Sequence, residues 1–290
     1  GMFKEEGLPD IRESWISKIL GKNTLTRMLG SEHKPFWDQE GVHEIYRRWR
    51  KILDAYPGDR MAVAEAWVSP ASRIARYVRA DELQNSFNFE MLTTLWKPEE
   101  IRKKINNSIS ALAEVGAPTS WVFNNHDVVR SVDRLDLGLT NHGATTLSRQ
   151  GDASKLNIAR GTLRARSATL MALALPGGTY LYQGEELAVP EVRDIPENRL
   201  TDPRWKMSSY KDRGRDGCRV PIPWKTSPHG AFGFSSRDSL TPDEAWLPAS
   251  SWWGQYSAES QENDPNSTLN IYRRALAVRK NEAGLGDGPM

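Results

Sequence analysis

Two segments carry residues whose types and positions could do chemistry. Ala62–Trp67 contains Glu65, and Val122–Asp127 ends in Asp127. Each carboxylate follows β-forming residues, as expected where a barrel strand presents an acid at the mouth of an active site. Cleavage of a bond between two sugars needs a carboxylic acid that protonates the departing oxygen and negative charge beside an oxocarbenium-like centre. We therefore interpret Glu65 and Asp127 as candidate catalytic residues.

The composition argues against several other classes of function. The chain has 290 residues and a formal net charge of +2 from 39 basic and 37 acidic residues, which gives no field to attract nucleic acid or an anionic membrane. Cys218 is the only cysteine, and we interpret it as a packing residue rather than a nucleophile. The longest apolar run, Ala168–Leu175, is too short to cross a bilayer, and the first residues lack the apolar core of a signal peptide. These features predict a cytoplasmic protein.

Hydrophobic periodicity predicts helices that alternate with strands. Helices are expected over residues 39–55, 99–115, 153–175 and 265–279, and strands over 61–67, 85–89, 121–124 and 179–183. This order is typical of parallel strands joined by helical crossovers, so the predicted fold class is α/β. Four strands cannot close a barrel of eight, and half of a barrel would leave two open edges and an uncovered apolar face. The Pro-, Gly- and Trp-rich residues 184–262 predict a long insertion over the barrel mouth, which divides the chain into 1–183, 184–262 and 263–290.

Four motifs follow one another along the chain: Ala64–Trp67, Asn124–Asp127, Thr179–Leu187 and Gly214–Trp224. The first three resemble the motifs at the ends of the fifth, seventh and eighth strands in glycoside hydrolase family 13, the α-amylase superfamily. The fourth resembles the run that marks the α-glucosidase and oligo-1,6-glucosidase branch. The resemblance covers nearly the whole chain. It implies strands 5–8 of a (β/α)8 TIM barrel, with a long insertion after strand 8, from the C-terminal half of a bacterial α-glucosidase catalytic domain.

The resemblance also implies roles for particular residues. Glu65 would be the general acid/base of a retaining mechanism, with its pKa raised by apolar neighbours such as Trp67. Asp127 would stabilise the transition state, while His126 and Arg219 would bind the sugar. The family's fourth-strand motif, which carries the nucleophile, is not found. We therefore expect it upstream of residue 1 and expect these 290 residues alone to be inactive.

The predicted substrate is a small α-glucoside such as maltose, isomaltose or a sucrose-type sugar, from which terminal glucose is released. A transglycosylase or isomerase resembling trehalose synthase, and a non-enzymatic scaffold relative, are the alternatives. No cofactor is expected, because the remaining histidines lack ligand spacing, although the missing N-terminal half could hold a calcium site. These histidines are His33, His43, His142 and His229. Nucleic acid and membranes are not expected as partners, and the oligomeric state stays open.

Several neighbouring residues have structural interpretations. Arg219 has two candidate ion-pair partners, Asp216 and Asp127, and the sequence does not choose between them. The adjacent Trp252 and Trp253 are interpreted as packing residues rather than a sugar platform. Supporting roles near the eighth-strand motif are predicted for Tyr182, Glu185 and Glu186.

Overall fold

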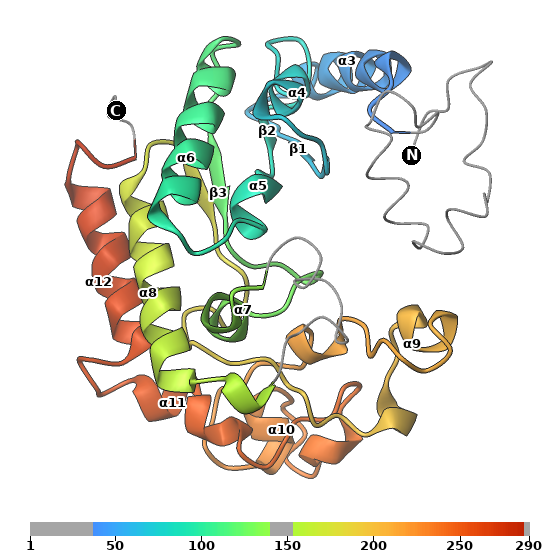
Figure 1. The fold of residues 1–290 in the computed structure, drawn as a ribbon, viewed down its shortest axis with the longest axis vertical. Helices are drawn as coiled ribbons and strands as arrows, with labels where there is room; N and C mark the ends of the chain where they lie inside the picture. The colour runs from blue at the N-terminus through green and yellow to red at the C-terminus, as the bar shows by residue number, and fades with distance from the viewer. Residues whose placement is uncertain (1–36, 140–152, 287–290) are drawn as a thin grey trace. The chain divides into compact units, whose positions relative to one another are not determined.

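The computed structural model describes residues 37–139 and 153–286 (Figure 1). These residues divide into two compact units, each described by itself here. The first unit contains the described part of Gly1–Asn88 together with Ile105–Ser120. The second contains Phe89–Lys104 and the described part of Trp121–Met290. His33 and His142 lie outside the described residues.

The first unit combines a short parallel sheet with amphipathic helices. Its elements are α3 (Glu40–Asp54), β1 (Val63–Ala64), α4 (Ala71–Arg76), β2 (Asn85–Ser86) and the C-terminal part of α6 (Pro98–Ala113). Strands β1 and β2 pair in parallel, with Val63 opposite Asn85. The predicted helices over 39–55 and 99–115 are confirmed to within two residues, whereas the strand expected over 61–67 is reduced to two residues.

Buried and more exposed side chains alternate along β1 and the residues after it, and the buried ones contribute to the core of this unit. Ala64, Ala66 and Val68 are buried and pack with Ile74 and Tyr77, among others. Because successive side chains of an extended segment point to opposite faces, the residues between them are directed away from this core. This alternation decides where the side chain of Glu65 lies.

A buried polar cluster accounts for one of the scattered histidines. His43 on α3 is fully buried, and its Nδ1 lies 2.8 Å from Oε2 of Glu82, which is also fully buried. Arg47 and Arg79 form ion pairs with the same carboxylate. His43 therefore has a carboxylate partner within the core, as buried polar groups generally require.

The second unit is mainly helical around a two-stranded sheet of β3 and β4. Its principal elements are α5 (Phe89–Leu92), β3 (Ser120–Val122), α7 (Ser131–Leu137), α8 (Ile158–Ala174), β4 (Gly178–Tyr180), α9 (Pro203–Met207), α10 (His229–Gly233), α11 (Ala258–Gln261) and α12 (Thr268–Asn281). Short 3₁₀ turns lie at Ala153–Lys155, Glu197–Arg199, Asp216–Cys218, Pro242–Glu244 and Trp253–Tyr256. The predicted helices over 153–175 and 265–279 are confirmed, with later starts.

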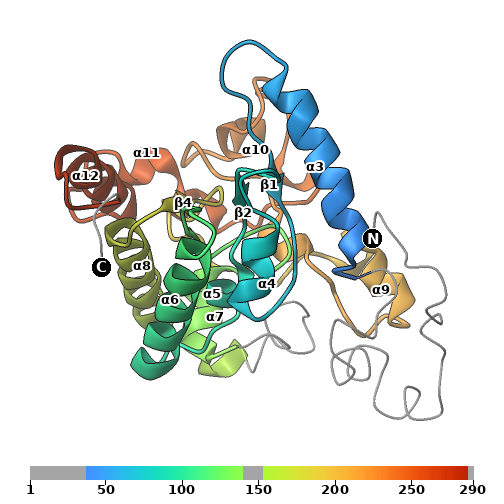
Figure 2. The ribbon, with the colours of Figure 1, turned by 90° about the horizontal axis from the view of Figure 1, so that it is seen from above.

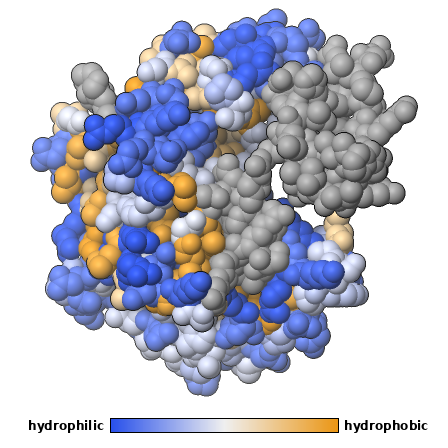
Figure 3. Space-filling model, in the orientation of Figure 1, coloured by the Kyte–Doolittle hydropathy of each residue, from blue (hydrophilic) through white to orange (hydrophobic). Residues whose placement is uncertain are grey.

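Helix α8 is the centre of the helical packing in this unit. It contacts α7 extensively and lies beside α12 in both ribbon views (Figures 1 and 2). Asn157 caps its N-terminus by accepting a hydrogen bond of 2.9 Å from the backbone N–H of Arg160. The outer sides of α8 and α12 keep some exposed apolar side chains, including Leu163 and Leu276. Hydrophobic surface is visible over this region in Figure 3.

The insertion-like segment has its own core despite its irregular sequence. Leu187, Val192 and Val220 pack with Phe232 and Trp253, among others. Trp253 is fully buried, and its Nε1 donates a hydrogen bond of 2.7 Å to the carbonyl oxygen of Pro221. The packing interpretation of Trp253 is therefore confirmed. The half-barrel arrangement and the three-part division at residues 183 and 262 stay predictions.

Gly161 sets the close approach of α7 and α8, and this can be tested. A Cβ at Gly161 would lie 2.3 Å from the carbonyl oxygen of Val132. We predict that Gly161→Ala lowers the free energy of unfolding by roughly 1–3 kcal/mol, because the backbone contact cannot yield without moving α7. Urea unfolding measures the change. Gly284→Ala is the control, because a Cβ there meets nothing within 4 Å, and equal stability of the two variants would contradict the packing argument.

Candidate active site

Asp127 lies on a tight loop that follows β3. The strand is anchored by Trp121 and Val122, both fully or almost fully buried. Two asparagines then fix the loop through side-chain to backbone hydrogen bonds. Oδ1 of Asn124 accepts from the backbone N–H of Ser131 at 2.7 Å, and Oδ1 of Asn125 accepts from the backbone N–H of Asp127 at 2.8 Å. The backbone of Asp127 is therefore held in place by the side chain of Asn125.

Two guanidinium groups converge on the Asp127 carboxylate. Oδ1 accepts hydrogen bonds from Nη1 of Arg215 at 2.8 Å and from Nη2 of Arg219 at 2.9 Å. Nε2 of His126 lies 3.6 Å from the same oxygen. Within the described part of the chain, Oδ2 makes no hydrogen bond. One oxygen thus holds the protein contacts, and the other can accept a hydrogen bond from a bound hydroxyl group.

Arg219 contacts the loop that carries Asp127 through its backbone as well as through the Asp127 carboxylate. Its Nε donates a hydrogen bond of 2.7 Å to the carbonyl oxygen of His126. Of the two candidate partners, Asp127 is therefore the one that Arg219 pairs with. Asp216 instead accepts hydrogen bonds from the backbone N–H groups of Thr201 at 2.6 Å and Asp202 at 3.0 Å.

A second carboxylate, Asp202, fixes the other guanidinium. Its buried side chain accepts hydrogen bonds from Nε of Arg215 at 2.6 Å and from Nη2 at 3.2 Å. Burial alone would raise the pKa of Asp202, but hydrogen bonds from the Arg215 guanidinium and from the backbone of Arg204 and Arg215 outweigh this effect and lower the pKa to about 2. The hydrogen bonds that Arg215 donates to Asp202 in turn raise the pKa of Arg215. Both groups are therefore charged at neutral pH.

Gly214 explains how Asp202 and Arg215 approach so closely. Its φ is +74°, and a Cβ there would lie 2.6 Å from the Asp202 side chain. Only glycine adopts this backbone conformation without strain and leaves room for the carboxylate. The glycine that opens the motif Gly214–Trp224 therefore has a steric role in building the ion pair.

Arg130 connects the end of β4 with the loop that carries Arg219. It is buried, and it donates hydrogen bonds of 2.9 Å to the carbonyl oxygens of Gln183 and Cys218. The Tyr182 hydroxyl donates to the same Cys218 carbonyl at 3.1 Å. Burial raises the pKa of the Cys218 thiol, which keeps it neutral and supports the packing interpretation of this residue.

Glu185 holds the same segment, the residues that follow β4, through its buried carboxylate. Its carboxylate accepts hydrogen bonds from the backbone N–H of Tyr182 at 3.0 Å and from the Tyr272 hydroxyl at 3.2 Å. These contacts hold the end of β4 against α12. They agree with the supporting roles predicted for Tyr182 and Glu185.

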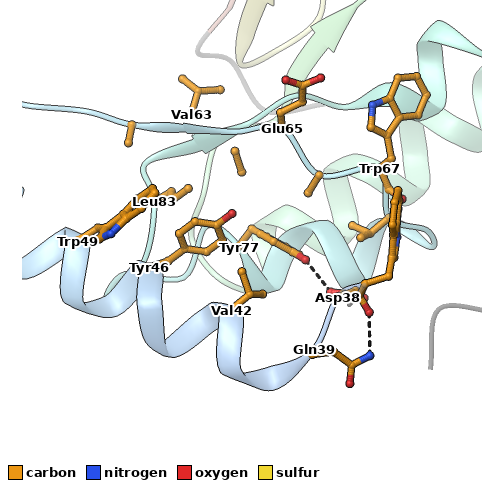
Figure 4. Close-up of a pocket in the computed structure, with 15 residues that line it drawn as sticks. Asp38, Gln39, Val42, Tyr46, Trp49, Val63, Glu65, Trp67, Tyr77 and Leu83 are labelled. Carbon is orange, nitrogen blue, oxygen red and sulfur yellow. Dashed lines mark hydrogen bonds between the residues drawn. The ribbon is translucent and has the colours of Figure 1, made fainter. Parts of the chain in front are cut away.

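Glu65 belongs to the first unit and follows β1 directly. Alternation places it on the face opposite the buried Ala64 and Ala66, and Figure 4 shows its carboxylate on the other side of the strand from the rings of Tyr46 and Tyr77. It is among the residues that line a hollow of about 430 Å³. Glu65 is exposed among the described residues, and its role as general acid/base stays a prediction.

Three of the four predicted residues, His126, Asp127 and Arg219, thus contact one another in the second unit. Sequence reasoning missed Arg215 and Asp202. Arg215 stands inside a motif that was recognised, so its type and place were available. Asp202 precedes Pro203, which is a typical helix-cap signal, and it does accept a hydrogen bond from the backbone N–H of Arg204. Nothing in the sequence links it to an arginine thirteen residues later.

Neither a metal cluster nor a membrane-spanning helix is found where the structure is described. No group of three or more His, Cys, Asp or Glu side chains in residues 37–139 and 153–286 could hold a metal ion. In the same ranges, no helix is long and apolar enough to cross a membrane.

Comparison with known families identifies the class of protein. Residues 2–288 match the family model described as the alpha amylase catalytic domain. The chain therefore belongs to the α-amylase family, glycoside hydrolase family 13, and the predicted resemblance is confirmed. The α/β barrel class agrees with this membership.

Curated relatives include proteins named as α-glucosidases and as maltases. The chain is 33% identical to a probable alpha-glucosidase of Rhizobium meliloti over 84% of this chain and 40% of the relative. It is 26% identical to an alpha-glucosidase of Schizosaccharomyces pombe, over 82% of this chain and 43% of the relative. A trehalose-6-phosphate hydrolase of Bacillus subtilis is 24% identical, over 95% of this chain and 50% of the relative. The chain thus spans half or less of the length of these relatives.

Solved structures show the same fold. An alpha-glucosyl transfer enzyme superposes with a TM-score of 0.68 at 28% identity, over 87% of this chain and 41% of that one. An isomaltulose synthase mutant of Erwinia rhapontici NX5 in complex with sucrose gives a TM-score of 0.71 at 18% identity, over 99% and 49%. At that identity the second likeness concerns the fold alone.

The ion pair of Asp202 predicts a pH dependence of stability. A carboxylate whose pKa is depressed on folding stabilises the native state above its unfolded pKa, about 3.9, and this contribution is lost as the pH falls through its folded pKa of about 2. We predict that Asp202→Asn costs about 2 kcal/mol at pH 7, and that its difference from the parent protein shrinks from pH 4 downward.

Urea unfolding at a series of pH values provides the measurement. The matched control is Asp238→Asn, because Asp238 is exposed and its side chain makes no hydrogen bond to a described residue. A difference between Asp202→Asn and the parent that stays constant from pH 7 to pH 2 would contradict the proposed charge state.

Proposed function

We propose that the protein to which this chain belongs is a retaining glycoside hydrolase that releases terminal α-linked glucose from short oligosaccharides such as maltose, isomaltose or sucrose-type sugars. The observation that carries the proposal is the pairing of Asp127 with Arg215 and Arg219 in a chain of the α-amylase family. Relatives named as α-glucosidases and maltases support the substrate class.

In this proposal Asp127 and Arg219 hold the terminal glucose. Oδ2 of Asp127 accepts a hydrogen bond from a ring hydroxyl, while Oδ1 stays bound to the two guanidinium groups. The hydrogen bond strengthens as positive charge develops at the anomeric carbon and ring oxygen. His126, whose ring is largely exposed beside Asp127, contacts the same sugar.

Glu65 supplies the proton in the proposed reaction. As a carboxylic acid it protonates the glycosidic oxygen while the bond from that oxygen to the anomeric carbon breaks, so that the leaving sugar departs as a neutral alcohol. A nucleophilic carboxylate, which we assign to no described residue, takes the glucosyl group. Glu65, now a carboxylate, then removes a proton from the water that releases glucose.

Transfer of the glucosyl group to a second sugar is the alternative function. One observation favours it: the likeness to an alpha-glucosyl transfer enzyme at 28% identity. Product analysis with maltose separates the two, because hydrolysis gives only glucose, whereas transfer gives a rearranged disaccharide or a longer sugar.

Two substitutions in the whole protein test the assigned roles. We predict that Glu65→Gln lowers kcat for maltose by about 10²–10⁴, the usual worth of general acid catalysis, but has a much smaller effect with α-glucosyl fluoride, because fluoride leaves without protonation. Asp127→Asn should impair both substrates by similar factors, because it acts on the glucosyl ring. Steady-state kinetics on each substrate provide the measurement.

Glu99→Gln serves as the matched control, because Glu99 is an exposed residue in the first turn of α6. It should retain the parent rate on both substrates. Near-normal turnover of maltose by Glu65→Gln would refute the acid/base role, and the same loss on both substrates would reassign Glu65 to binding.

A further inference from the structure

The second unit contains a hollow of which Arg219 is the one described lining residue that is also assigned to the terminal glucose. It has a volume of about 630 Å³, which falls within the range of small-molecule binding sites. Arg219 lines it and at the same time donates its hydrogen bond of 2.9 Å to Asp127. A ligand in the hollow would therefore adjoin the ring that Asp127 holds.

Two exposed aromatic side chains line this hollow. Trp246 is 80% exposed and Phe234 is 54% exposed. Single exposed apolar residues are common, but two large rings on one hollow provide a surface on which an apolar ligand face can stack.

The backbone that carries each ring is anchored in the core. The neighbours of Trp246, Ala245 and Leu247, are both buried, and Phe234 follows the buried Phe232 at α10. Rigid attachment lowers the entropy lost when a ligand binds to an exposed ring. The two rings are therefore presented at fixed places rather than on a loose loop.

Polar groups in the hollow are few and balance in charge. Among its described lining residues, Arg219 is the one cation and Glu244 the one anion, and Ser235 and Ser236 add hydroxyl groups. The Glu244 carboxylate is oriented by hydrogen bonds from the backbone N–H of Thr241 at 2.9 Å and from its hydroxyl at 3.0 Å. This balance suits a neutral polyol better than a phosphorylated sugar, because the negatively charged phosphate would be repelled by the Glu244 carboxylate.

We propose that this hollow is a subsite for the part of the substrate beyond the terminal glucose, and that it takes a neutral sugar ring whose apolar face stacks on Trp246. The inference rests on the proposed function, since it extends the same site past Arg219. A pyranose ring has an apolar face of C–H groups and an edge of hydroxyl groups. The aromatic face in the hollow can contact the first, and the flanking hydroxyl and charged groups can bind the second.

The test compares Trp246→Ala with the parent protein on two classes of substrate. One is the better hydrolysed of maltotriose and isomaltotriose, and the other is α-glucosyl fluoride, which has no second sugar. Trp246→Ala should lower kcat/KM for the trisaccharide about ten-fold, as expected for loss of one ring contact, and leave α-glucosyl fluoride unchanged. Trp246→Phe should restore most of the loss.

Tyr210→Ala is the matched control, because Tyr210 is an aromatic residue of the same unit that is 63% exposed and lies outside the hollow. It should leave both substrates unchanged. Equal kcat/KM of Trp246→Ala and the parent on the trisaccharide would overturn the subsite, while turnover of α-glucosyl fluoride would still support the proposed function.

The opposite failure is distinguishable. If the parent protein does not turn over α-glucosyl fluoride, the proposed function fails, and the hollow is then tested by binding alone. Quenching of tryptophan fluorescence by maltotriose should be kept in Tyr210→Ala and reduced in Trp246→Ala. Equal quenching in the two variants would overturn the subsite.

Discussion

The buried carboxylate of Asp202 makes the arrangement around Asp127 electrostatically feasible. Two guanidinium groups on one oxygen of Asp127 repel each other and leave an excess of positive charge. Asp202 binds Arg215 through two of its nitrogens, so that two cations face two anions. Arg215 is thereby fixed from both ends. Removal of one member would leave a poorly compensated charge in a partly buried site.

This ion-pair chain is itself held by backbone and core. Asp216 accepts hydrogen bonds from the backbone at Thr201 and Asp202, and Gly214 gives the Asp202 side chain room. Arg130 ties the carbonyl oxygens of Gln183 and Cys218 together from behind. Behind Arg130 the environment is buried: burial, with Asp133 nearby, raises the pKa of Glu191 to about 8 although it accepts a hydrogen bond from the Arg130 backbone. Polar contacts in such surroundings are stronger than in water.

Much of the secondary structure could be predicted from local sequence signals. Helix periodicity located the helices over 39–55 and 99–115 to within two residues, because amphipathic patterns and breakers act locally. Strand lengths were overestimated, because β-forming residues also occupy extended segments without a ladder partner. The exposure of Glu65 follows from its alternation with the buried Ala64 and Ala66, because successive side chains of an extended segment point to opposite faces.

The contacts that define the candidate site were less accessible from sequence. Recognised motifs gave Asp127 and Arg219, and left two possible partners for the arginine. The choice between them depends on loops that meet about ninety residues apart in the chain, which no local pattern encodes. Asp202 carried only a capping signal, and a cap residue has no sequence mark that distinguishes it from an ion-pair anchor.

A double-mutant cycle between Asp202 and Arg215 tests the central claim most directly, namely that Asp202 acts on Asp127 only through Arg215. The measurement is kcat/KM for α-glucosyl fluoride in the whole protein, with Asp202→Asn made in the parent and in Arg215→Gln. The ion-pair chain predicts that Asp202→Asn lowers kcat/KM about ten-fold in the parent, equivalent to about 1.4 kcal/mol, and has no further effect once Arg215 is replaced. The same loss in both backgrounds would contradict it.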